Sequence, residues 1–203
     1  MKATQVLPLN YHPSGKFDLK SKKQIIILNL VGLVLLIFSI WFFGWLANFL
    51  RGSSATSFSF QISSMSTALI AIGKLLLTIV FVLVLHEGIH ALFFWVYSRQ
   101  KPVVGFKGAY AYAAMPGWYF PRNQFMVIGI APLIVISLIG VLFLAILPIS
   151  SINLVLVALV INTSGAVGDL FVVIWLLTKP RETFANDKID SIEFYVPGKP
   201  EVN

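Results

Sequence analysis

The sequence predicts an all-α integral membrane protein with four transmembrane helices and a short β-hairpin-like loop between the second and third helices. Three observations lead to this fold class. The 203 residues are 58% hydrophobic and only 11% charged, whereas soluble domains are nearer half apolar and a quarter charged. Four apolar runs are long enough to cross a bilayer, which takes about 20 residues. The Lys and Arg residues gather between those runs.

The first predicted span contains no charged residue between Lys23 and Arg51. It is too long for the core of a signal peptide, so we expect an uncleaved signal anchor. The second span holds one cation, Lys74, near its start, where a long side chain can reach the interface. The chain then forms a single membrane domain with tails at 1–24 and 178–203. Its four predicted helices cover residues 25–49, 68–97, 125–147 and 153–177.

Positive charge sets the predicted orientation. Of the 15 Lys and Arg residues, 13 lie in the two tails and in the loop after the second span. The positive-inside rule therefore places both termini and this middle loop in the cytoplasm, in a multi-pass protein of the cell membrane. The net charge of +7 then orients the chain in its lipid bilayer and does not indicate a nucleic-acid partner. The absence of cysteine excludes disulfides, thiolate metal sites and a cysteine nucleophile.

The middle loop, 98–124, is rich in glycine, proline and aromatic residues. Its β-prone patches at 103–104 and 110–112 predict a β-hairpin or a partly re-entrant sheet. An interfacial aromatic belt without a role in recognition is an equally good interpretation. A further short strand is predicted at 192–196 in the C-terminal tail.

The second predicted span carries the segment His86-Glu87-Gly88-Ile89-His90. Residues four apart share a helix face, so the two histidines point the same way and Glu87 lies beside them. This is the HExxH pattern of zincins, in which the histidines bind Zn²⁺ and the glutamate acts as general base on water. In a chain of this composition, roughly 0.001 chance matches are expected. Ionisable residues at membrane depth are costly and usually functional, which disfavours a pair of packed core histidines.

A catalytic zinc centre usually has a third protein ligand. Besides Glu87, Asp169 is the only acidic residue in the predicted spans. At about 1.5 Å per residue, His90 lies roughly 14 Å before Arg99, and Asp169 lies roughly 15 Å before Lys179. Because the two residues share a depth, we expect Asp169 to be the third ligand. His12, Asp18, Asp187 and Asp190, among the other possible ligands, lie in the predicted tails.

The histidine motif, followed two helices later by an Asn…Gly-Asp segment, resembles the site-2-protease-type intramembrane zinc metalloproteases. The four-helix size and the run H-E-G-I-H-A-L-F-F are still more similar to a family of small bacterial membrane proteins described as putative zincin peptidases. The resemblance spans about 75–177. Site-2 proteases carry a proline-rich approach to an L-D-G aspartate, from which Ser-Gly-Ala-Val-Gly-Asp-Leu departs. The resemblance implies Glu87 as general base, Asn162 as a contact for substrate or transition state, and Zn²⁺ held by His86, His90 and Asp169.

Two other protease chemistries fit less well. An intramembrane aspartyl protease needs a second aspartate facing Asp169, and no predicted span contains one. A serine–histidine dyad built on Ser164 needs neither Glu87 nor a pair of histidines. We therefore predict a zinc-dependent intramembrane peptidase that cleaves membrane-associated proteins or peptides. The alternative is a non-catalytic metal-binding membrane protein or scaffold.

Overall fold

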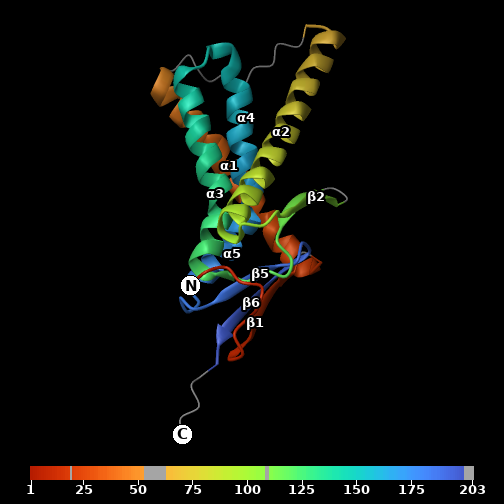
Figure 1. The fold of residues 1–203 in the computed structure, drawn as a ribbon. Helices are drawn as coiled ribbons and strands as arrows, with labels where there is room; N and C mark the ends of the chain where they lie inside the picture. Colours follow the sequence, from red (N-terminus) through yellow and green to blue (C-terminus); the bar gives the residue numbers. More distant parts are fainter. Residues whose placement is uncertain (19, 53–62, 108–109, 199–203) are drawn as a thin grey trace. The chain divides into compact units, whose positions relative to one another are not determined.

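The computed structural model describes residues 1–18, 20–52, 63–107 and 110–198, and these form five helices and six strands. The strands lie near both ends of the chain and between the second and third helices (Figure 1). In chain order the elements are β1 (Tyr11–Asp18), α1 (Lys22–Arg51), α2 (Met65–Ser98), β2 (Val103–Lys107), β3 (Tyr110–Ala114), β4 (Phe120–Pro121), α3 (Arg122–Ile146), α4 (Ile149–Gly165), α5 (Val167–Leu177), β5 (Phe184–Asp187) and β6 (Ser191–Pro197).

Helices α1, α2 and α3 are each long and apolar enough to cross a membrane, and α4 with α5 makes a fourth candidate if the pair is one span. The prediction of one continuous fourth helix is wrong. The pair is bent by 45° at Ala166, where α4 ends and α5 begins. Gly165 and Gly168 flank the bend, and glycine is among the weakest helix formers.

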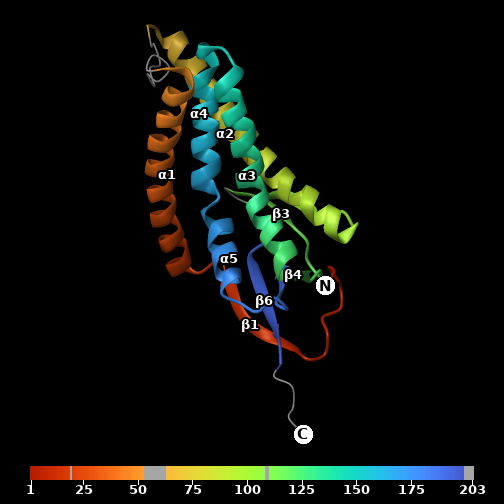
Figure 2. The same cartoon turned by 90° about the vertical axis from the view of Figure 1, so that its left-hand side faces the viewer.

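The all-α prediction is also wrong, because the two tails and the end of the middle loop build a four-stranded antiparallel sheet in the order β1-β6-β5-β4. Figure 2 shows β1 and β6 of this sheet beside each other. The first strand pairs with the last, from Tyr11 opposite Pro197 to Asp18 opposite Ser191. The predicted strand at 192–196 is confirmed as part of β6. The strand β1 gave no such signal, because it contains Pro13 and pairs, within the described residues, with a strand at the other end of the chain.

The predicted hairpin of the middle loop is confirmed by the antiparallel pairing of β2 with β3 in a separate two-stranded sheet. Its strand β2 exposes Val103, Val104 and Phe106. Adjacent residues of a strand point to opposite faces, so both faces of β2 present apolar side chains. A hairpin of this kind is suited to a lipid or protein surface.

The described contacts divide the chain into two compact units. The first combines 1–29, 87–132 and 168–203, and the second combines 30–86 and 133–167. The core of the second unit is purely helical: Phe43, Ala47, Leu144, Ile152, Leu156, Leu159 and Val160. The core of the first mixes sheet and helix residues: Phe17, Phe94, Met115, Phe120, Phe125, Ile128, Val172, Leu176, Ala185 and Phe194.

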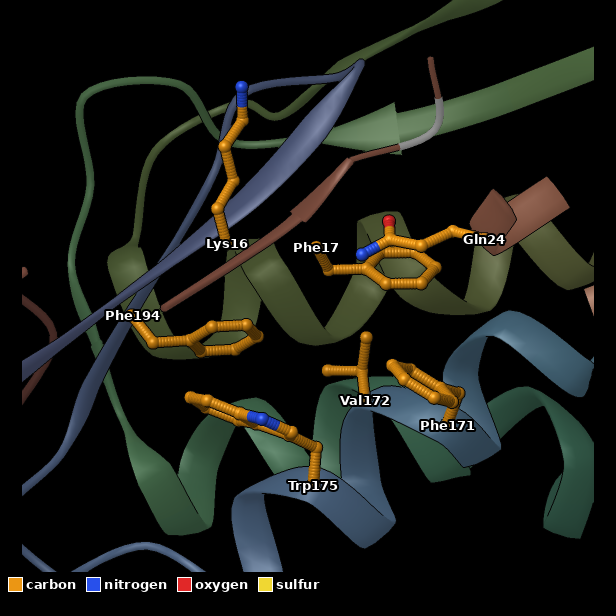
Figure 3. A pocket seen from close by; sticks show the side chains of 7 residues that line it. All are labelled: Lys16, Phe17, Gln24, Phe171, Val172, Trp175 and Phe194. Atoms are coloured by element: carbon orange, nitrogen blue, oxygen red, sulfur yellow. The ribbon is translucent and has the colours of Figure 1, made fainter. Parts of the chain in front are cut away.

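Within the first unit, the sheet packs on α5 through aromatic side chains (Figure 3). Phe194 of β6 lies against Trp175 of α5 with 4.0 Å between ring centroids. Phe17 of β1 lies 5.3 Å from Phe171 in the same way. These rings, with Val172, surround a small cavity. The tails of the chain therefore hold α5 in place.

Much of the apolar side-chain surface of α1 and α2 is exposed. Trp41 and Phe49 on α1, and Leu77 and Phe81 on α2, are each more than three-fifths exposed. Patches of this extent on a monomer mark a surface that another apolar phase covers. Together with the length of the helices, this exposure indicates a membrane environment.

The sheet makes a prediction about topology, because a hydrogen-bonded sheet cannot be divided by a bilayer. Strands from before α1, from between α2 and α3, and from after α5 share it. Reporters inserted at Gln100 and fused after Asn203 should therefore report the same compartment, the cytoplasm by charge. A reporter at Ser57, which lies outside the described residues, should report the opposite side. Opposite signals from Gln100 and Asn203 would contradict the four-span topology.

Candidate metal centre

Both histidines of the HExxH segment are buried in the structure. Helix α2 runs without a break from Met65 to Ser98, so His86 and His90 lie one turn apart on one face. Their exposed fractions are 8% and 7%. A buried imidazole must find partners for its ring nitrogens, and each ring uses Nδ1 for a bond to another helix.

The ring of His86 is held by Asn162 of α4. His86 Nδ1 lies 3.1 Å from Asn162 Oδ1, and Asn162 Nδ2 donates to the Leu133 carbonyl at 3.5 Å. The amide nitrogen faces a carbonyl, so the amide oxygen faces the histidine and accepts a hydrogen bond from its Nδ1. Nδ1 of His86 therefore carries the hydrogen and Nε2 carries the lone pair. Asn162 thus orients a histidine; its predicted contact with substrate or transition state stays a prediction.

The ring of His90 is held by a backbone carbonyl of α3. Its Nδ1 lies 2.8 Å from the oxygen of Ile128. A carbonyl can only accept, so Nδ1 of His90 must be the donor. Nε2 of His90 is then the nitrogen left for a metal, as it is in His86. Without a metal it faces the Asp169 carboxylate, an acceptor, so it holds a hydrogen that a metal ion would displace. Two imidazoles that present Nε2 in this way are suited to bind a metal.

Asp169 lies in the first turn of α5, just after the bend. Its Oδ1 is 3.4 Å from Nε2 of His90. The ligand atoms of His86, His90 and Asp169 all lie within 4.8 Å of one another, so the three residues could hold a metal ion. Two imidazole nitrogens and one carboxylate oxygen are a common protein ligand set for a catalytic Zn²⁺. The residues present therefore fit the ion that the motif implies.

Glu87 follows His86 directly and is half-buried. It is not among the three residues whose ligand atoms cluster. In a zincin the glutamate is likewise beside the metal and not bound to it. The position of Glu87 is therefore suited to a base that acts on water at the centre.

Asp187, which was expected only in the C-terminal tail, also lies near this centre. Burial raises the pKa of the Asp187 carboxyl to about 7, although a hydrogen bond from the Ile189 amide and the charge of His90 oppose the rise. The charges of Glu87 and Asp169 add to it. The pairing of β5 with β4 and β6 places Asp187 in the first unit. A carboxyl group with a pKa of about 7 therefore lies within electrostatic reach of the centre.

The two rival chemistries find no support in the described residues. The Ser164 hydroxyl donates to Val160 and Ile161 carbonyls of its own helix, at 2.9 and 3.3 Å. A nucleophilic serine would instead face a histidine. Asp187 is the aspartate brought near Asp169, but it does not join the cluster of ligand atoms.

A comparison with protein families supports the metallopeptidase assignment. The sequence model of a family described as "putative zincin peptidase" matches residues 79–184, just over half of the chain. The chain belongs to this family. The match contains the HExxH segment, the bend and Asp169, so the zincin family assignment covers the whole candidate centre. Comparisons with curated proteins and with solved structures found no match.

The geometry predicts a graded response of metal content to substitution. Replacing any of the three clustered ligands by alanine should remove most of the approximately one zinc per chain in the purified protein. Asn162→Ala should weaken zinc binding by about 10–100-fold without abolishing it, because it removes an outer partner of His86. Zinc content by elemental analysis and affinity by chelator competition measure both effects. Full zinc retention in Asp169→Ala would show that the third ligand lies elsewhere.

Proposed function

We propose that this protein is a zinc-dependent intramembrane peptidase that hydrolyses peptide bonds in membrane-associated substrates. The clustering of His86, His90 and Asp169 beside Glu87 carries the proposal. The membership of the zincin family supports the same reaction class. The helices α1, α2 and α3, apolar enough to cross a bilayer, support placing it in the membrane.

In this function, His86, His90 and Asp169 hold the ion. Zinc, when bound, lowers the pKa of a coordinated water to about 7 and polarises the substrate carbonyl. Glu87 accepts the proton of the attacking water and returns it to the leaving amine. The partners of the histidine Nδ1 atoms keep both rings in the ligand orientation throughout.

Water and substrate would reach this centre from the side of the sheet. Glu87, His90 and Asp169 belong to the same compact unit as the sheet, to which the positive-inside rule assigns the cytoplasm. We therefore propose a cytoplasmic approach to the centre.

We further propose that β2 of the hairpin pairs with an unwound segment of the substrate. Its apolar side chains are exposed, and strand addition to a sheet edge is a common mode of peptide recognition. A transmembrane substrate must leave its helical form before a peptide bond can be attacked, and an added strand stabilises the extended form.

Proline substitution tests this role of β2. Amides of adjacent strand residues face opposite edges, so Val103→Pro and Val104→Pro remove hydrogen-bond donors from different edges. The variant that loses the outward amide should cleave more slowly while its zinc content stays at the wild-type level. Val103→Ala and Val104→Ala are the matched controls. Full cleavage by both proline variants would exclude strand addition on β2.

The substitution Glu87→Gln separates the peptidase from the metal scaffold. Glutamine has nearly the same shape but cannot accept a proton, so zinc and fold should be retained while turnover falls by about 10²–10⁴-fold. A structural metal site should be indifferent to the change. Cleavage of a transmembrane substrate in vesicles, with zinc measured on the same samples, gives the answer.

Two results would support the scaffold instead. The first is a wild-type protein that cleaves nothing in a broad panel of transmembrane substrates. The second is full complementation of a deletion phenotype by Glu87→Gln. Together they would show that the metal centre has no catalytic role.

A further inference from the structure

Pro132 lies inside α3, one turn after the carbonyl that holds His90. In an α-helix, the carbonyl of residue i accepts a hydrogen bond from the amide of residue i+4. For Ile128 that amide would belong to position 132. Proline has no amide hydrogen, so the helix supplies no i+4 donor to the Ile128 oxygen.

The Ile128 carbonyl obtains its donor from another helix. It accepts the Nδ1 hydrogen of His90 at 2.8 Å, and both residues are buried, with exposed fractions of 2% and 7%. A buried carbonyl without a donor is costly, and more so in an apolar phase. The proline and the histidine therefore complement each other, because one removes a donor and the other replaces it.

The packing around Ile128 also places its carbonyl near the predicted ligands. The next residue, Gly129, lies so close to α5 that an added Cβ would be 3.1 Å from Val173 and 3.9 Å from the carbonyl oxygen of Asp169. Helix α3 thus lies directly against the first turn of α5, which carries the predicted carboxylate ligand. The Ile128 carbonyl, on the same stretch of α3, holds the histidine that faces this carboxylate.

We propose that Pro132 is a positioning residue of the metal centre, which reserves the Ile128 carbonyl for His90 and so keeps the His90 Nε2 lone pair directed at the ion. The proposal rests on the proposed function in that it takes His90 to be a metal ligand. Outer partners of this kind fix the tautomer and the orientation of a ligating imidazole. Pro132 itself contacts neither ion nor substrate in this role.

The substitution Pro132→Ala restores an amide that competes for the Ile128 oxygen. Zinc affinity by chelator competition should fall by about 10–100-fold. The thermal stability of the metal-free protein should stay the same or rise, because a helix-breaking residue is removed. In spectra of ¹⁵N-histidine-labelled, metal-free protein, the Nδ1–H proton resonance of His90 should move upfield, because the competing amide weakens its hydrogen bond to Ile128.

The matched control is lactic acid at position 132, introduced as an ester in place of the amide. It has the side chain of alanine but no N–H, so it should keep wild-type zinc affinity and the wild-type Nδ1–H resonance of His90. Pro148→Ala, at the start of α4, should also leave both unchanged. Together these variants separate the effect of the missing donor from that of the proline ring.

Wild-type affinity in Pro132→Ala would overturn the proposal. So would an equal loss of affinity in the alanine and lactic acid variants, because the N–H would then be irrelevant. If the wild-type protein bound no zinc, the proposed function would fail, while the Nδ1–H resonance of His90 in the metal-free variants would still decide the role of Pro132. Zinc binding without cleavage would leave this inference intact and refute the peptidase.

Discussion

The candidate centre depends on two hydrogen bonds, each of which holds the Nδ1 hydrogen of a histidine on α2. His86 donates a hydrogen bond to Asn162 of α4, and His90 donates one to the Ile128 carbonyl of α3. An imidazole can present Nε2 to a metal in a defined direction only if its other nitrogen is bound elsewhere. The two bonds therefore specify the face of α2 that the ion would occupy and the neighbours that this face requires.

The cost of burying a polar group explains which partners the other polar side chains near the centre have. A polar side chain inside an apolar helix must be satisfied by another helix, since neither lipid nor aliphatic side chains can bond to it. Asn162 meets this demand with two bonds that reach two different helices. The bend at Ala166 then lets α5 start in a new direction, and Asp169 in its first turn meets His90. A continuous helix would have placed Asp169 differently relative to Asn162.

The four-stranded sheet supports the helix that carries the third predicted ligand. Phe194 packs on Trp175 and Phe17 packs on Phe171, so the position of α5 depends on strands from both ends of the chain. The same strand pairing places Asp187 within electrostatic reach of Glu87 and Asp169. The tails are thus part of the functional unit, and a deletion that removed β1 or β6 would disturb the helix that carries the third ligand.

Local patterns in the sequence determined the apolar helices, the HExxH face of α2, the hairpin of the middle loop and the strand β6. These follow from hydropathy, helical spacing and β-propensity over a few residues. Even Asp169 could be chosen, because few charged residues occur in the apolar runs and depth can be counted along a helix. Only the tertiary structure decided the break between α4 and α5, the sheet and the bond from Asn162 to His86. The tertiary structure also decided the hydrogen bond between His90 and the Ile128 carbonyl, and it placed Asp187 within electrostatic reach of the centre. Those features join residues far apart in the chain, and the hydrogen-bond partner of a buried group is set by which backbone and side-chain atoms the packed helices bring within reach.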